Sequence, residues 1–172
     1  PERTASLRQS LFEIERRIEG YLWIKTLVSL LTAVLCYAVL ATVGVDFASF
    51  WALLIFLFNF IPNIGSLFAV LLPTVLTLLQ FGDLGVFFVV LVALSAIQAV
   101  IGNLIEPRLM GRTLNLSPLV IILSLTLWGS IWGVAGMFLC VPLTALLAIV
   151  LSKFEPTRPV AVLLSSDGRL AD

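Results

Sequence analysis

Histidine is absent from this 172-residue chain, and cysteine occurs only twice, at Cys36 and Cys140. Without histidine the chain lacks the commonest metal ligand and the side chain that ordinarily titrates near neutral pH. Two cysteines inside apolar runs have no metal-site spacing and argue against a disulfide. Catalysis by a serine–histidine pair is excluded, and the sequence shows no paired carboxylates, metal-ligand cluster or phosphate-binding loop. We therefore expect no enzyme, no metal site and no cofactor.

Charge is also scarce, at 12% of the residues against about 25% in a soluble domain. Four long runs carry no charge at all: 26–45, 47–82, 84–105 and 113–152. A bilayer core of about 30 Å is crossed by ~20 helical residues, so every run is long enough to reach across. The fold class predicted is all-α integral membrane, a polytopic helical bundle whose first partner is the lipid bilayer. A basic patch with aromatics is missing, so no nucleic acid is expected as a partner.

The charge pattern divides the chain into three parts. Residues 1–20 have apolar side chains at three- and four-residue spacing among charges of both signs, which predicts an amphipathic cytoplasmic or interfacial helix. Residues 21–152 form the predicted transmembrane domain. Residues 153–172, which hold two prolines and two serines, are expected to be a cytoplasmic tail.

Within the transmembrane domain we predict spans at about 21–43 and 84–105, and broken or re-entrant helical hairpins at 47–82 and 113–152. The run 47–82 is too long for one crossing, and helix-breaking residues stand near its middle. Its two half-helices are each expected to fall short of a full crossing. Lys25, near the start of the first span, is expected to reach back to the lipid headgroups.

The distribution of lysine and arginine supports the hairpins. The basic residues before the first span place the N-terminal end in the cytoplasm. Arg108 and Lys153 are then cytoplasmic only if both long runs return to the side from which they start. The two hairpins would enter from opposite faces, each with a proline (Pro73, Pro142) in its second half, which is a faint inverted-repeat pattern. The alternative is that any two hydrophobic hairpins look this similar.

The break of the first hairpin is the first candidate for function. Backbone that leaves helix geometry inside a membrane must be buried in protein or line a wet cavity. Half-helix ends with partial charges would face a solute there, and polar side chains could add hydrogen bonds. The predicted pathway residues of this break are Asn59, Pro62, Asn63, Gly65 and Ser66. A tip that only lets two helices turn is the alternative.

A second set of polar residues follows on the span 84–105. Ser95, Gln98, Gly102 and Glu106 recur at three- and four-residue steps, so they share one face of a continuous helix, and Asn103 lies beside them. Ser95, Gln98 and Asn103 are predicted to line the solute path. Interhelical hydrogen bonding between packed helices remains the alternative.

Glu106, Pro107 and Arg108 are predicted to lie in a polar loop. One interpretation is a cytoplasmic gate, or an ion pair of Glu106 with Arg108 that locks one state. The other is a loop that ends the helix before Pro107 and places Arg108 at the headgroups.

The run 113–152 is interrupted by small residues, and its predicted hairpin break holds Gly129, Gly133 and Gly136. Gly129 and Gly133 also form a small-xxx-small pair, which is typical of close helix packing.

Several motifs in series resemble a known family over about 10–152, namely the autoinducer-2 exporter (AI-2E), or PerM-type, permeases. Family members are roughly twice as long, so the chain looks like the C-terminal half of one, and the missing N-terminal half is expected as a partner. Many members have Gly-Pro after the first motif, where this chain has Ser66-Leu67, so a hydroxyl cap is expected there. The motifs are Ile61-Pro62-Asn63-Ile64-Gly65, Glu106-Pro107-Arg108-Leu109-Met110-Gly111, Leu116-Ser117-Pro118-Leu119 and Trp128-Gly129 through Val141-Pro142.

The resemblance implies a multi-pass transporter of the bacterial inner (plasma) membrane. We expect a permease or exporter for a small polar solute, such as one like autoinducer-2, driven by a secondary mechanism with an ion or a gradient. Its partners would be that small-molecule or ion cargo and further copies of itself in a homo-oligomer. The alternatives are a sodium/proton antiporter, although the acids here all fall at predicted edges, and a non-transporting membrane scaffold.

Overall fold

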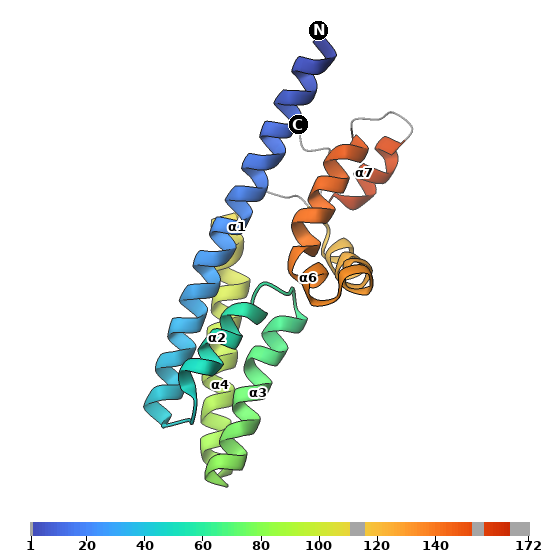
Figure 1. The fold of residues 1–172 in the computed structure, drawn as a ribbon. Coiled ribbons are helices and arrows are strands. Elements are labelled where there is room, and N and C mark those ends of the chain that lie inside the picture. The colour runs from blue at the N-terminus through green and yellow to red at the C-terminus, as the bar shows by residue number, and fades with distance from the viewer. Residues whose placement is uncertain (1, 111–115, 153–156, 166–172) are drawn as a thin grey trace. The chain divides into compact units, whose positions relative to one another are not determined.

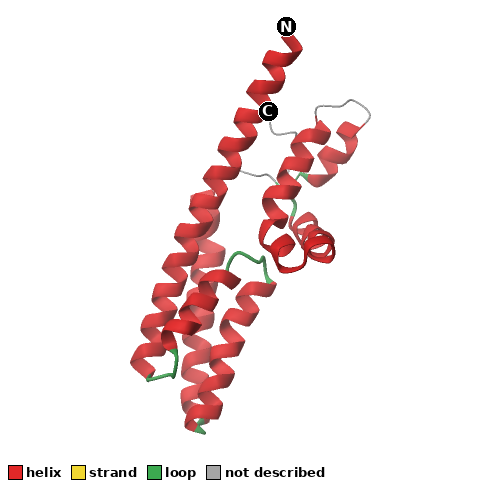
Figure 2. Cartoon of the chain, viewed as in Figure 1, coloured by secondary structure: helices red, strands yellow, loops and turns green. Residues whose placement is uncertain are grey.

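The structure is a computed structural model that describes residues 2–110, 116–152 and 157–165. These residues are helical almost throughout and include no β-strand (Figure 2). Four helical runs are long and apolar enough to cross a membrane, at 18–43, 64–81, 84–110 and 118–152. The predicted all-α membrane fold is therefore confirmed.

Figure 1 shows the helices of the described residues. In chain order they are α1 (Glu2–Val43), α2 (Ala48–Phe58), α3 (Ile64–Phe81), α4 (Leu84–Val100), the π-helix η1 (Ile101–Ile105), α5 (Glu106–Met110), α6 (Pro118–Ser152) and α7 (Arg158–Leu164).

The chain divides into two compact units, which are described separately. Unit 1 comprises residues 1–23 and 112–172, and unit 2 comprises residues 24–111. The predicted surface helix 1–20 and the predicted span 21–43 form one continuous helix, α1. The tail segments 153–156 and 166–172 lie outside the described residues.

In unit 2, α2 and α3 form the two arms of the first hairpin around a break at residues 59–63. The second arm is longer than predicted: α3 has 18 residues and is by itself long enough to cross a membrane. Pro73 does not end it. The hydroxyls of Thr74 and Thr77 donate to the carbonyl oxygens of Val70 and Thr74 in the same helix.

The predicted polar loop from Glu106 to Arg112 is wrong over its described part, because α4, η1 and α5 make one helical run through Met110, while residues 111 and 112 lie outside the described residues. Within this helical run lies a wide π turn, in which the Glu106 N–H donates to the Ile101 carbonyl oxygen. A proline ring in a regular helix clashes with the carbonyl four residues earlier, and a wider turn relieves such a clash. Pro107 therefore follows the π turn without breaking the helix.

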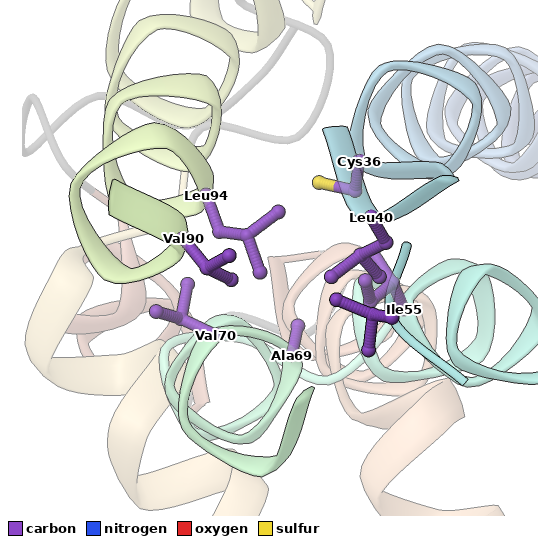
Figure 3. Close-up of a cluster of buried hydrophobic side chains, with 8 residues drawn as sticks. Cys36, Leu40, Ile55, Ala69, Val70, Val90 and Leu94 are labelled. Carbon is purple, nitrogen blue, oxygen red and sulfur yellow. The ribbon is translucent and has the colours of Figure 1, made fainter. Parts of the chain in front are cut away.

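The core of unit 2 brings one face from each of four helices together. Side chains of α1, α2, α3 and α4 point toward one another in Figure 3. Burying this apolar surface fixes the packing of the hairpin against α1 and α4. The members are Cys36, Leu40, Val45, Ile55, Ala69, Val70, Val90 and Leu94.

In unit 1 the helix α6 is itself a hairpin. Gly133 has φ 61° and ψ −138°, which is not helical, and the chain reverses there. The indole nitrogen of Trp128 donates to the Thr144 hydroxyl at 3.0 Å, which joins the two arms. The predicted break near Gly133 thus corresponds to a real change of backbone direction.

Candidate functional site

One face of α1 carries buried polar side chains where the other faces are apolar. Lys25, Ser29 and Thr32 are buried and stand four and three residues apart, so they share that face. The same face continues with Cys36 and Leu40, which belong to the apolar core. The buried face of α1 in unit 2 is therefore mixed along its first half, where Val28 is buried beside the polar residues, and apolar along its second.

Asn59 begins the hairpin break and contacts this face. Its side chain is buried, and its amide nitrogen donates to the Ser29 hydroxyl oxygen at 3.2 Å. The backbone N–H of Asn59 also closes the last turn of α2 by donating to the Ile55 carbonyl. A predicted pathway residue is thus held to α1, 30 residues earlier in the chain.

Lys25 forms an ion pair with Glu106 of α5. The lysine is 6% exposed, and the glutamate side chain is 19% exposed. The prediction that Lys25 reaches the headgroups is wrong, because its ammonium group turns inward to this carboxylate. Lys25, Ser29, Asn59 and Glu106, which two polar contacts connect in pairs, are called the polar seam below.

The partner expected for Glu106 was Arg108, but the structure pairs Glu106 with Lys25 instead. Pro107 and Arg108 are exposed on α5. Sequence reasoning missed Lys25 and Ser29. The available signal was their four-residue spacing within an apolar span, which placed two polar side chains on one helix face.

The π turn explains why Glu106 faces α1. The buried face of α4 runs through Val90, Leu94 and Ile101, in steps that a regular helix would continue at residue 105. The wide turn from Ile101 to Glu106 inserts one residue, so the glutamate follows Ile101 on that face. The sequence stripe assumed a regular helix and missed this shift.

The other predicted residues of the α4 face are not gathered at the polar seam. Ser95, Gly102 and Asn103 are exposed. Gln98 is half-buried, and its side-chain nitrogen is buried without a hydrogen-bond partner among the described residues. Burying a donor without a partner costs about 1–3 kcal/mol, which favours a functional reason for keeping it.

The remaining break residues shape the backbone. Asn63 is exposed and has φ 58°, and the Pro62 carbonyl accepts from the Ile64 N–H at 2.6 Å. The Ser66 hydroxyl donates to the Asn63 carbonyl at 2.8 Å. The expected hydroxyl cap at Ser66 is not formed, because the residue that caps α3 is Asn63, and its side chain makes no capping bond.

Gly65 lets the two arms of this hairpin meet. A Cβ atom at Gly65 would overlap the carbonyl oxygen of Phe58, the last residue of α2. The glycine is buried, and its N–H donates to the Ile61 carbonyl at 3.1 Å. Its role in the structure is this close approach of backbone to backbone.

Unit 1 has the same kind of close backbone approach at a glycine. A Cβ atom at Gly136 would overlap the Trp128 carbonyl oxygen, and one at Gly129 would press on Met137. The predicted close packing at Gly133 is not seen, since a Cβ there would meet no described atom within 4 Å. Gly133 supplies the backbone reversal instead.

The chemistry of the seam is hydrogen bonding and charge pairing. Among the residues that the structure describes, no group of three or more His, Cys, Asp or Glu could hold a metal ion. A buried ionisable pair between apolar helices is costly and is by default a sign of function in a membrane protein. The geometry fits the handling of a polar solute or an ion.

The sequence profile of the AI-2E family transporters matches residues 1–155. A putative transport protein of Haemophilus influenzae is 42% identical over 164 residues, which is 95% of this chain and 47% of that protein. The AI-2 transport protein TqsA of Escherichia coli is 42% identical over 160 residues, or 91% of this chain and 46% of that protein.

A putative transport protein of Borreliella burgdorferi is 35% identical over 164 residues, or 95% of this chain and 45% of that protein. The chain thus spans about half the length of these curated relatives. All three are named as transport proteins and none as an enzyme.

Proposed function

This chain belongs to the AI-2E family of transporters and is a multi-pass membrane protein, and we propose that it moves a small polar solute by a secondary mechanism. The observation that carries the proposal is the buried contact of Asn59 with Ser29. It places a side-chain amide of the hairpin break inside the protein, which is where broken-helix transporters build their sites.

The polar groups of unit 2 suit an uncharged cargo that donates and accepts hydrogen bonds. Asn59 and Ser29 can each donate and accept hydrogen bonds, and Gln98 offers a buried donor. The cation of Lys25 is already paired with Glu106. TqsA, a relative, is named as an AI-2 transport protein, so autoinducer-2 is the first cargo to test.

The test is flux in proteoliposomes with a panel of small polar solutes, autoinducer-2 included, under an imposed ion gradient. We expect the Asn59→Ala and Ser29→Ala variants to lose about ten-fold in initial rate, because each removes one buried hydrogen-bonding group. Thr42→Ala is the matched control, since Thr42 is an exposed hydroxyl on α1. Wild-type flux in both variants, with folded protein, would contradict the assignment.

Sodium/proton antiport is the second candidate, and Glu106 is the observation that favours it. This carboxylate lies within a run that is long enough to cross a membrane, and it is largely buried. Antiport needs a titrating group at such a place. A pH-dependent sodium flux that Glu106→Gln abolishes would support antiport over solute transport.

The cellular setting belongs to the same proposal. The basic residues before the first span favour a cytoplasmic N-terminal end, in a bacterial inner membrane, and a return of α6 to the cytoplasmic side. Because the relatives are about twice as long, we propose that a second half of the same transporter fold works with this one. We further propose that the transporter forms a homo-oligomer. Reporter fusions at both ends and native mass spectrometry test these points.

A further inference from the structure

We propose that the Lys25–Glu106 ion pair is a latch between α1 and α5 that must open during each transport cycle, with Lys25 as its positioning residue. This inference rests on the proposed transport function. Lys25 and Glu106 are 81 residues apart in the chain, and each lies in a helical run long enough to cross a membrane.

The position of the pair is unusual for charge. Lys25 and Glu106 directly flank the charge-free runs 26–45 and 84–105, and both lie in helical runs long enough to cross a membrane. Lysines that only anchor a helix extend to the headgroups, whereas this one is 6% exposed and turns to Glu106. Ionisable side chains buried between membrane-spanning helices are by default candidates for a functional step.

The latch is coupled to the hairpin break through α1. Ser29 lies one turn beyond Lys25 on the same buried face, and it accepts the hydrogen bond of Asn59. A movement of α1 that separates Lys25 from Glu106 therefore also pulls on the contact at the break. The ion pair and the solute site would change together.

A second polar contact closes the other end of the α1 segment in unit 2. The Gln80 amide donates to the Gly44 carbonyl at 2.9 Å, and its oxygen accepts from the Asp46 N–H at 2.8 Å. From Lys25 to Val43 the helix rises about 27 Å, close to the thickness of a bilayer core. Unit 2 is thus fastened near both ends, as a closed state of an alternating-access device would be.

The decisive experiment cross-links the latch reversibly. Cysteines replace Lys25 and Glu106 in a protein whose Cys36 and Cys140 are changed to alanine, and a reducible bis-thiosulfonate reagent joins them. We expect solute flux to fall about ten-fold on cross-linking and to recover on reduction, because a fixed latch cannot open. The same double-cysteine variant treated with a monofunctional thiosulfonate reagent is the control. A pair that serves only stability would tolerate the tether, and unchanged flux would overturn the proposal.

Charge exchange gives a second test. Lys25→Glu and Glu106→Lys should each lower flux about ten-fold, since each leaves a buried charge without its partner. The double exchange should restore most of the flux, whereas an exchange of Glu106 with Arg108 should not. Arg16→Glu, the same reversal at an exposed position of α1, controls for the change of net charge. Failure of the Lys25–Glu106 exchange to restore a folded protein would count against the pairing.

A third measurement does not depend on the cargo. A cysteine at Ser29, which is fully buried, should react slowly with a membrane-impermeant thiol reagent. Adding Lys25→Gln should raise that rate at least about five-fold, because the open state becomes more populated. If the wild type shows no flux but Lys25→Gln still raises the labelling rate, the proposed cargo is wrong and the latch stands. An unchanged rate would reject the latch itself.

Discussion

The breaks of the two hairpins share one contact, in which a carbonyl oxygen at the end of one arm lies against a glycine of the next arm. In unit 2 the Phe58 carbonyl lies against Gly65, and in unit 1 the Trp128 carbonyl lies against Gly136. Each glycine lets the end of one arm approach the start of the next. A buried proline follows in each second arm, Pro73 in one and Pro142 in the other.

The breaks differ in what holds them. Asn59 reaches outside its own hairpin to Ser29 on α1. Among the described residues, Trp128 hydrogen-bonds within its own hairpin, to Thr144 of the opposite arm. The comparison teaches that the reversal is a steric requirement that glycine meets in both places. The polar link to a neighbouring helix is an addition, and it distinguishes the break that we connect with transport.

The largest expected effect comes from filling the close approaches. Gly65→Ala and Gly136→Ala should each destabilise the protein by more than about 4 kcal/mol or prevent folding, because the new Cβ overlaps a backbone oxygen that cannot move aside. Thermal unfolding in detergent, followed by size-exclusion chromatography, measures this.

Gly20→Ala is the matched control for both alanine variants, since a Cβ at Gly20 meets no described atom within 4 Å. In the middle of α1 it should stabilise by up to about 1 kcal/mol. If Gly65→Ala or Gly136→Ala were as stable as Gly20→Ala, the two breaks would not share the same backbone contact.

A middle-sized effect tests how each chain reversal is made. Gly133 has φ 61° and ψ −138°, a region that other residues rarely enter, whereas Asn63 has φ 58° and ψ −56°. Gly133→Ala should cost about 1–3 kcal/mol. Asn63→Gly should be neutral or slightly stabilising, because glycine accepts positive φ without strain. Melting temperatures of the two variants check this, and the opposite order would contradict it.

The smallest effect on stability separates structure from function. Asn59→Ala and Trp128→Phe each remove one side-chain hydrogen bond, so both should cost about 1 kcal/mol. Only the first should reduce solute flux, since Trp128 contacts its own hairpin. Parallel measurement of melting temperature and of flux makes the comparison. Equal losses of flux would show that both breaks serve transport.

The architecture was largely predictable from local composition. The long charge-free runs predicted spans and hairpins, and breaks appear near Pro62 and Gly133, where helix-breaking residues interrupt those runs. The length of α3 and the helical run through Pro107 were not predicted. A proline read alone signals an end, but α3 continues through Pro73, and the π turn before Pro107 accommodates that ring.

The candidate site was only partly predictable. Asn59 and Glu106 could be singled out as polar residues near breaks and edges, but their partners could not. Ser95 was expected on the same face as Gln98, with Asn103 beside that face, yet both are exposed. Ser95 follows the buried Leu94 by one residue in a regular helix and so lies off the buried face, whereas the π turn changes only the residues after Ile101 and brings Glu106 to face α1.

By itself the sequence determined that this is a helical membrane protein, because long runs without charge have few other stable environments. It also determined where the chain reverses, because proline and glycine act through the backbone close to their own position. Only the tertiary structure decided that Lys25 meets Glu106 and that Ser29 meets Asn59. Those contacts join residues 81 and 30 positions apart, and helix phase and packing set them rather than any local pattern.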